Sequence, residues 1–279
     1  MEVELTRMRV VLLGLLLLCA ALLVWWFLQR PSHERPWADD VARLLTAQVD
    51  GSVVTLSNVR DFEWRTETDY TARWETRQYD LDTLQSADLV LSYWMGPAIA
   101  HTLVSFGFAD GRYLTFSSEI RKEKGEAFSA WKGFFRQYEA VMIAAQESDI
   151  IRVRSEVRGE QVYMYRLAIP PEQLRTLFLA YVDEARRIEK TPEFYNTLTS
   201  NCTTVVFQIA KQIQPDLPLD YRLLLSGYFA EYAHDQGGLV AGVPFEVLKK
   251  RGRVHSMTGV QNMANEQDYS RYIRRELPK

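Results

Sequence analysis

The hydrophobic pattern of this chain begins with an uninterrupted apolar run. Residues 10–28 carry no charged side chain, and Arg30 and Pro31 follow shortly after them. A helix that crosses the hydrocarbon core of a bilayer needs roughly 20 apolar residues, and this run has about that length. The pattern predicts a transmembrane helix over residues 10–29, after a tail of residues 1–9 and before a polar linker of residues 30–36.

Two other interpretations of the apolar run fit less well. A cleaved signal peptide has a shorter apolar stretch followed by a small-residue cleavage site, whereas residues 24–27 (VWWF) prolong the run. A lipoprotein signal would place a small residue before its cysteine, but Leu18 precedes Cys19. An uncleaved anchor is therefore favoured. The tail before the helix is short, and Trp25 and Trp26 suit the outer interface of the membrane. Both features favour a tail on the inner side of the membrane and a main domain on the outer side.

Beyond residue 36, strand-like and helix-like patterns occur without regular alternation. Apolar residues at helical spacing predict helices over residues 37–49, 126–145, 171–188, 202–213 and 221–234. Stretches rich in branched and aromatic residues predict strands over residues 52–56, 88–94, 99–108, 112–121, 150–157 and 161–169, the last four as two hairpins. This mixture indicates one α+β domain over residues 37–279, with no internal boundary.

Composition and charge remove several function classes. The net charge of -3 gives no overall basic field for nucleic-acid binding. There is no His, Cys, Asp or Glu cluster at metal-ligand spacing and no glycine loop that would hold a phosphate, so neither a metal nor a cofactor is expected. The two cysteines, Cys19 and Cys202, leave one unpaired thiol outside the apolar run. In an oxidising compartment such a thiol needs a reason to exist.

Cys202 lies where a helix is predicted to begin. Asn201 is a good N-cap residue, so Cys202 falls in the first helical turn. The free backbone N–H groups and the positive end of the helix dipole favour a thiolate there, and the same N–H groups could hold an oxyanion. The alternative is an inert thiol that packs as a small apolar group beneath the helix.

A base for this thiol must come from four histidines. His33 lies in the linker, His255 in a polar late segment, and His234 at a helix end, where a capping role is the default. His101 lies inside an apolar strand, where an imidazole must find a buried partner or a cleft. It is the candidate base, and a satisfied core histidine is the alternative.

The turn of the 99–121 hairpin decides which residue faces His101. A two-residue turn would place Ile120 opposite His101, whereas a three-residue loop at 109–111 with a left-handed Gly111 would place Glu119 there. The sequence Asp110-Gly111 favours the second option. Glu119 would then orient the imidazole and stabilise its charged form; otherwise it is a solvated strand residue.

Five sequence strings carry a family resemblance. They are NVRDF (58–62), WETRQYDL (74–81), HTLVSFGFADGRYL (101–114), SSEIRKEKGE (117–126) and YNTLTSNCTT (195–204). Together they resemble the Lnb N-terminal periplasmic domain family, with weaker similarity in LLSGYFAEY (224–232). Circularly permuted papain-like (NlpC-type) domains have a characteristic order of groups: a histidine on a strand, a polar group on the next strand, and then an Asn-Cys pair that opens a helix. This chain has the same order, so that fold is expected.

The resemblance also implies a chemistry. The family's namesake is a bacterial lipoprotein N-acyltransferase, which implies a thioester on Cys202, His101 as base and then acid, and Glu119 as third group. Tyr195, Asn196, Asn201 and Thr203 would form the substrate-binding wall. A membrane lipid or lipoprotein substrate, the bacterial inner membrane and a periplasmic main domain follow from the same resemblance.

Some expectations stay open at this point. Unlike the namesake, this chain shows no later apolar run of spanning length, which leaves the acyl donor and acceptor open. Arg60, Asp61, Glu75 and Arg77 match family positions, and either an ion-pair network or substrate contact accounts for them. A cysteine peptidase or amidase of the cell envelope, and a non-catalytic domain that binds an envelope partner, are the competing functions.

Overall fold

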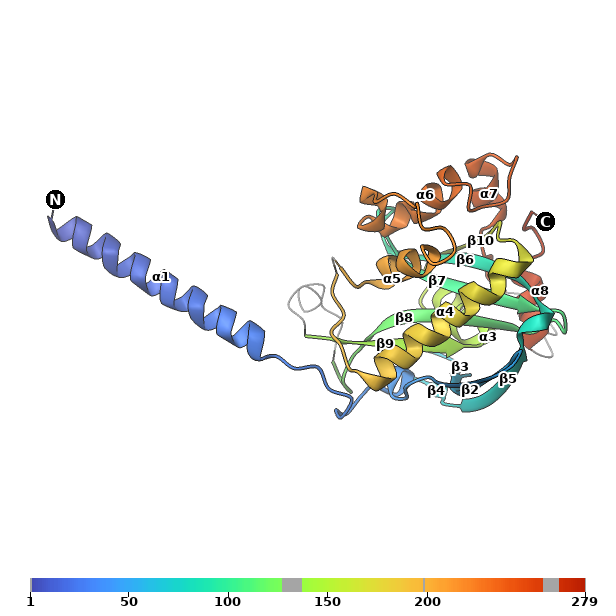
Figure 1. The fold of residues 1–279 in the computed structure, drawn as a ribbon, viewed down its shortest axis with the longest axis horizontal. Coiled ribbons are helices and arrows are strands. Elements are labelled where there is room, and N and C mark those ends of the chain that lie inside the picture. The colour runs from blue at the N-terminus through green and yellow to red at the C-terminus, as the bar shows by residue number, and fades with distance from the viewer. Residues whose placement is uncertain (1, 127–136, 198, 258–265, 279) are drawn as a thin grey trace.

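One long apolar helix projects from a globular part. The computed structural model describes residues 2–126, 137–197, 199–257 and 266–278. Helix α1 (Glu2–Leu28) extends away from the rest of the chain (Figure 1). Its segment Thr6–Leu28 is long and apolar enough to cross a membrane, and none of its most apolar window is buried. Such a helix near the N-terminus is either an anchor or a signal sequence.

The globular part is built on a mixed sheet of eight strands. In spatial order the sheet runs β1-β2-β9-β8-β7-β6-β10, and β5 also pairs with β2. The pairing of β2 with β9 is parallel and all the others are antiparallel. The strands are β1 (Thr46–Asp50), β2 (Val53–Arg60), β5 (Trp74–Asp80), β6 (Leu84–Met95), β7 (Ile99–Phe108), β8 (Tyr113–Arg121), β9 (Glu139–Ala145) and β10 (Gln161–Arg166), with a separate pair β3 (Glu63–Trp64) and β4 (Tyr70–Thr71).

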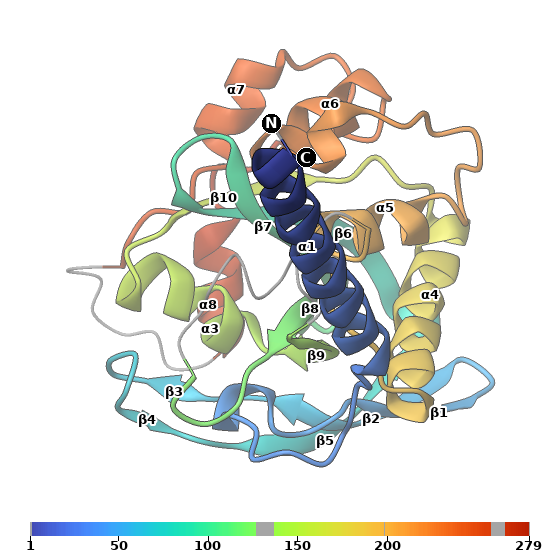
Figure 2. The same ribbon diagram turned by 90° about the vertical axis from the view of Figure 1, so that its left-hand side faces the viewer.

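Helices cover both faces of this sheet (Figures 1 and 2). On one face, Phe178 and Tyr181 of α4 pack against Phe106 and Phe116 of the central strands, and α5 lies beside α4. On the other face, α3 and α8 form a second cluster. The helices are α3 (Glu147–Ile150), α4 (Pro171–Lys190), α5 (Cys202–Ala210), α6 (Phe229–Asp235), α7 (Phe245–Arg251) and α8 (Glu266–Ile273), with short helical turns η1 (Asp39–Val41), η2 (Leu81–Thr83), η3 (Val153–Val157), η4 (Tyr221–Leu223) and η5 (Ser226–Tyr228). The domain is therefore α+β, as expected.

The predicted elements with strong periodicity are confirmed. The strand over 88–94, the hairpin over 99–121 and the helix over 171–188 are present, and a helix begins at Cys202. The helix predicted over 221–234 is broken into two short turns before α6. At Gly227, within the second of these turns, the backbone packs tightly against the β6–β7 turn: a Cβ added there would lie 2.1 Å from the Pro97 oxygen.

Three predicted elements are wrong. The predicted helix over 37–49 is instead the turn η1 followed by the edge strand β1. Residues 139–145 form the strand β9, and residues 127–136 of that prediction lie outside the described residues. A short apolar run buried on both faces, such as β9, has no period that separates strand from helix. Residues 150–157 end α3 and form the π-helical turn η3, so β10 pairs with β6 and forms no hairpin there.

The β7–β8 hairpin has the predicted three-residue loop. Phe108 donates its N–H to Arg112, Gly111 adopts a left-handed φ of 82°, and the register places Gly107 opposite Tyr113. The same register, continued along both strands, sets Glu119 opposite His101. The choice of loop therefore fixes that the histidine faces Glu119 rather than Ile120.

Candidate functional site

The candidate site lies where two neighbouring strands part. Pairing between β7 and β8 ends at Leu103 and Ser117, while β7 continues to pair with β6 and β8 with β9. His101 and Glu119 lie just past this point. The two strands therefore diverge around them, and α5 packs against both strands.

Asn201 fixes the start of α5. Its side-chain oxygen accepts hydrogen bonds from the N–H groups of Thr203 and Thr204, each at 2.8 Å, and the Thr204 hydroxyl accepts one from the Asn201 N–H. This reciprocal capping box satisfies N–H groups that the helix itself cannot pair. Cys202 is the first residue of α5, as predicted, and it is buried with 7% of its surface exposed.

His101 belongs to a hydrogen-bonded chain of polar side chains. Its Nε2 lies 2.7 Å from Ser117 Oγ and 3.2 Å from Glu119 Oε1. The Ser117 hydroxyl donates to Glu119 Oε1 at 2.7 Å, so its oxygen accepts from a protonated Nε2. Arg154 of η3 donates to the same carboxylate oxygen at 2.7 Å. Glu119 is thus held between two groups that can carry positive charge.

The charged groups in this row of hydrogen-bonded side chains shift one another's pKa values. Burial disfavours the charged imidazole, but Glu119 and Cys202 outweigh burial and raise the pKa of His101 to about 9. Burial likewise opposes ionisation of Glu119, yet His101 and Arg154 hold the pKa of its carboxyl well below the usual value. A protonated imidazole beside a carboxylate is therefore the favoured state at neutral pH.

The Cys202 thiol is the acidic member of the group. Burial raises its pKa, but the charge of His101 and a side-chain interaction with it overcome that effect, so the net shift is downward. The backbone N–H of Thr102 and the Thr203 hydroxyl lower the pKa further. Because β7 has left β8 at this point, the backbone of Thr102 can face α5.

The four predicted wall residues lie around the start of α5. Burial and the neighbouring Cys202 raise the pKa of the Tyr195 hydroxyl well above its ordinary value, and the Cys202 backbone N–H lies within hydrogen-bond reach of that hydroxyl. Thr203 is fully buried, and its hydroxyl lies 2.8 Å from that of Thr102 on β7. Asn196 accepts a hydrogen bond from the Thr199 N–H and pairs with Ser200. The Thr203 contact joins α5 to β7, and the Asn196 contacts close the loop that leads into α5.

Two residues of the site were not predicted. Ser117 lies two positions before Glu119, so both side chains are on one face of β8, and the hairpin register contained that information. Arg154 could not be found in the same way, because residues 150–157 read as a strand and form η3 instead. Its guanidinium is almost fully buried, and it also donates to the Ile150 carbonyl at 2.8 Å.

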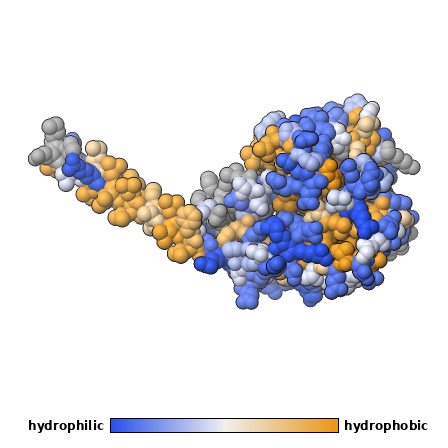
Figure 3. Space-filling model, viewed as in Figure 1, coloured by the Kyte–Doolittle hydropathy of each residue, from blue (hydrophilic) through white to orange (hydrophobic). Residues whose placement is uncertain are grey.

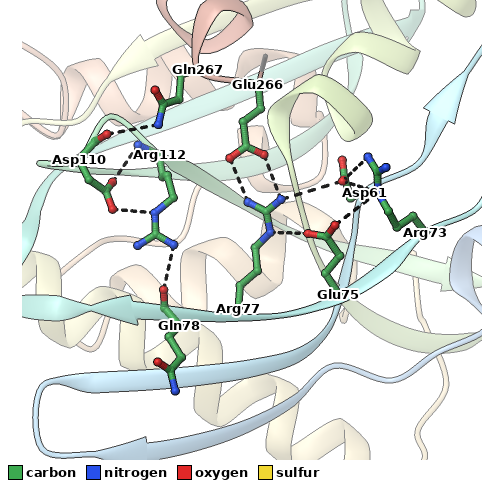
Figure 4. Close-up of polar contacts among 9 residues, drawn as sticks. All are labelled: Asp61, Arg73, Glu75, Arg77, Gln78, Asp110, Arg112, Glu266 and Gln267. Carbon is green, nitrogen blue, oxygen red and sulfur yellow. Dashed lines mark hydrogen bonds and ion pairs between the residues drawn. The ribbon is translucent and has the colours of Figure 1, made fainter. Parts of the chain in front are cut away.

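The four charged residues of the first two sequence strings form ion pairs away from Cys202 and His101. Arg60 binds Asp149 in a buried pair at 2.8 Å. Arg77 lies between Glu75, at 2.7 Å, and Glu266 of α8, at 3.0 Å (Figure 4). Asp61 pairs with Arg73 at 2.6 Å in the same network. These contacts favour the structural explanation of the four residues over direct substrate contact.

The other histidines lie in different surroundings. His33 Nε2 contacts the Glu189 carbonyl at 3.1 Å, and His234 Nε2 contacts the Val243 carbonyl at 3.3 Å. His255 is partly exposed, 4.0 Å from Glu276. Within the described part of the chain, no group of three or more His, Cys, Asp or Glu side chains is placed to hold a metal ion.

Comparison with known families identifies the class of domain. Residues 70–227, more than half of the chain, match the Lnb N-terminal periplasmic domain. The chain belongs to this family. The match includes His101, Glu119 and Cys202, whereas the string at 58–62 lies before it. No curated protein and no solved structure gives a match to the chain.

Proposed function

We propose that this protein is a thiol-dependent acyltransferase or acyl hydrolase of the periplasmic membrane surface. Cys202 is the nucleophile, His101 the base and acid, and Glu119 the group that orients the imidazole. In this proposal, residues 37–279 form a circularly permuted papain-like domain. The observation that carries the proposal is geometric: Cys202 opens the Asn201-capped helix α5, α5 packs against β7 and β8, and His101 of β7 faces Glu119 of β8 at 3.2 Å.

The order of groups supports these roles. Because Nε2 is engaged by Ser117 and Glu119, Nδ1 is the ring nitrogen that exchanges a proton with the thiol. The negative Glu119 stabilises the imidazolium that forms, as a third group does in other nucleophile–histidine sites. Arg154 keeps Glu119 ionised, so the carboxylate does not take the proton itself.

The reaction proceeds through a thioester. His101 takes the thiol proton, the Cys202 thiolate attacks the carbonyl carbon of an acyl ester, and a C–S bond forms. The C–O bond then breaks, and the leaving alcohol receives the proton from His101. In the second half, an amine or water attacks the thioester while His101 accepts its proton, and the C–S bond breaks to regenerate the thiolate. In this proposal the Cys202 N–H and the Tyr195 hydroxyl turn from each other toward the oxyanion and stabilise it in both halves.

The N-terminal helix fits a substrate that resides in a bilayer. In this proposal α1 stays uncleaved in the bacterial inner membrane as a single span, with residues 1–9 in the cytoplasm and the domain in the periplasm. The substrate is then a membrane lipid or a lipoprotein, and no cofactor takes part. Each chemical step uses side chains and backbone groups of this chain only.

Intact-protein mass spectrometry tests the proposal. The full chain with Cys19→Ser is incubated with phospholipid vesicles, and the expected product is an acyl adduct on Cys202 that hydroxylamine removes. Cys202→Ser is the matched control and must remain unmodified. Amidase turnover of peptidoglycan fragments without an adduct would replace the proposal with the peptidase alternative, and the absence of both would favour a non-catalytic binding domain.

A further inference from the structure

Exposed apolar side chains gather on two segments of the globular part. One is the turn between β6 and β7, where Met95 is 54% exposed and Trp94 44%. The other is the segment before η5, where Leu219 is 82% exposed and Tyr221 65%. We call these four residues, together with the exposed Leu224 and Leu225, the apolar rim. A continuous apolar surface outside the core marks a site of association with another apolar phase.

Short contacts join the two segments into one surface. The Gly227 N–H donates to the Ala98 carbonyl and the Ala100 N–H to the Ser226 hydroxyl, each at 2.9 Å. The Tyr93 hydroxyl donates to the Gly227 carbonyl at 2.5 Å. The turn therefore cannot move independently of the η5 segment. Ala100, whose N–H makes one of these contacts, directly precedes His101, so the contacts that join the two segments reach the strand residue next to the candidate base.

Little charge opposes burial of the apolar rim. Residues 93–98 contain no charged side chain. In the second segment, Arg222 pairs with Asp220 at 2.9 Å and with Asp235 at 2.6 Å, so these three charges form one ion-pair group with a net charge of -1. Tryptophan and tyrosine beside leucine and methionine are the residues that favour the boundary between water and hydrocarbon.

The chain that follows α1 is fastened to the domain. The Ser32 N–H donates to Glu139, Arg35 pairs with Glu139 at 2.9 Å, and the His33 ring contacts the Glu189 carbonyl. Only the residues between Leu28 and Ser32 remain as a connection, and these reach at most about 14 Å when extended. The domain therefore stays close to the end of α1.

The β6–β7 turn, which carries Trp94 and Met95 of the apolar rim, lies on the side of the domain from which α1 departs. In Figure 1, α1 leaves toward the left, and the segment from α4 into α5 runs along that same edge. Figure 2, seen from that edge, shows the β6–β7 turn near the viewer. Figure 3 shows apolar surface on the upper part of the same edge.

We infer that the apolar rim inserts into the outer leaflet of the bilayer that holds α1, and holds the candidate site close to lipid acyl esters. The inference rests on the proposed function, because it takes α1 as an anchor. The short connection holds the domain at the membrane, and the apolar rim is the face that then meets it. Cys202, although buried from water, is approached from the lipid side.

Depth-dependent quenching tests the insertion. In the full chain with Cys19→Ser and Cys202→Ser, a single cysteine at Met95 or Leu224 carries the environment-sensitive dye NBD. Val247→Cys on α7 is the control, because Val247 is also an exposed apolar residue, at 41%. In vesicles of phosphatidylethanolamine and phosphatidylglycerol with nitroxide-labelled lipid, quenching at Met95 and Leu224 should exceed that at Val247 several-fold. Equal quenching at the three positions overturns the inference. A change in NBD fluorescence that follows the protein concentration instead of the lipid concentration overturns it too, because it indicates contact between protein molecules.

A charge substitution links the surface to the chemistry. The double variant Met95→Glu, Leu224→Glu should form the lipid-derived adduct on Cys202 at least tenfold more slowly, while iodoacetamide alkylates Cys202 within twofold of the normal rate. Val247→Glu should change neither rate. An unchanged adduct rate in the double variant overturns the inference and leaves the proposed function standing. If the wild-type chain forms no adduct, while lipid still quenches the dye at position 95 in the labelled variant, the proposed function is refuted and the insertion stands.

Discussion

His101 Nε2 lies 3.2 Å from Glu119 Oε1, and the two residues occupy facing positions on strands that have ceased to pair. In a regular ladder the backbones of both strands would be occupied with each other. Here their divergence lets the capped start of α5 approach β7, so a thiol, an imidazole and a carboxylate come into one neighbourhood. The hairpin loop sets the facing pair, and the divergence admits the helix.

Glu119→Gln should weaken catalysis through the imidazole. Glu119 is the largest favourable influence that raises the pKa of His101 to about 9, so its loss lowers that pKa. The alkaline limb of the pH–rate profile for thioester formation should move below 9, and the rate should fall by at least about tenfold. Ser117→Ala, which keeps the carboxylate, is the control and should lose less. An unmoved alkaline limb would exclude Glu119 as the orienting group.

Arg154→Met should destabilise the domain. The buried guanidinium compensates Glu119, and removal of one partner of a buried pair typically costs about 3 kcal/mol because a charge is left uncompensated. The pKa of Glu119 should rise, since one of the two cations that depress it is gone. Thermal unfolding followed by circular dichroism measures the loss. Arg65→Met, which removes an exposed pair with Asp69, should cost less than about 1 kcal/mol.

The stability contributed by His101 should depend on pH. Its folded-state pKa is raised to about 9, above the ordinary value near 6.5. The contribution is therefore fully present below about pH 6.5 and is lost as the pH rises through about 9. The unfolding midpoints of the wild type and His101→Gln, compared between pH 6 and pH 10, should converge at alkaline pH. A constant difference across this range would contradict the raised pKa.

Asn201→Ala should loosen the start of α5. The amide oxygen accepts two backbone N–H groups of the first turn, and loss of such a cap costs about 1 kcal/mol. Thiol reactivity should fall with it, because Cys202 is no longer fixed at the helix start. Asn201→Ser retains an N-cap oxygen and should recover most of the stability. Equal behaviour of the alanine and serine variants would show that the cap does not position the thiol.

Much of the site was predictable because its parts are local. The Asn-Cys pair at a helix start and the Asp110-Gly111 loop each encode their geometry within a few residues. The partner of Glu119 was not predictable, because Arg154 arrives from η3, a π-helical turn without a periodic signature. Strand β9 was misassigned as helix for a related reason: it is apolar on both faces. Its neighbours in the sheet, rather than its own pattern, make it a strand.

The most direct test is the pH dependence of Cys202 alkylation by iodoacetamide in the full chain with Cys19→Ser. An ordinary thiol titrates near pH 8.5. The account predicts that the midpoint for Cys202 lies below this value and that it shifts upward in His101→Gln. A midpoint near 8.5 that is the same in both proteins would contradict it, since the imidazole would then have no hold on the thiol.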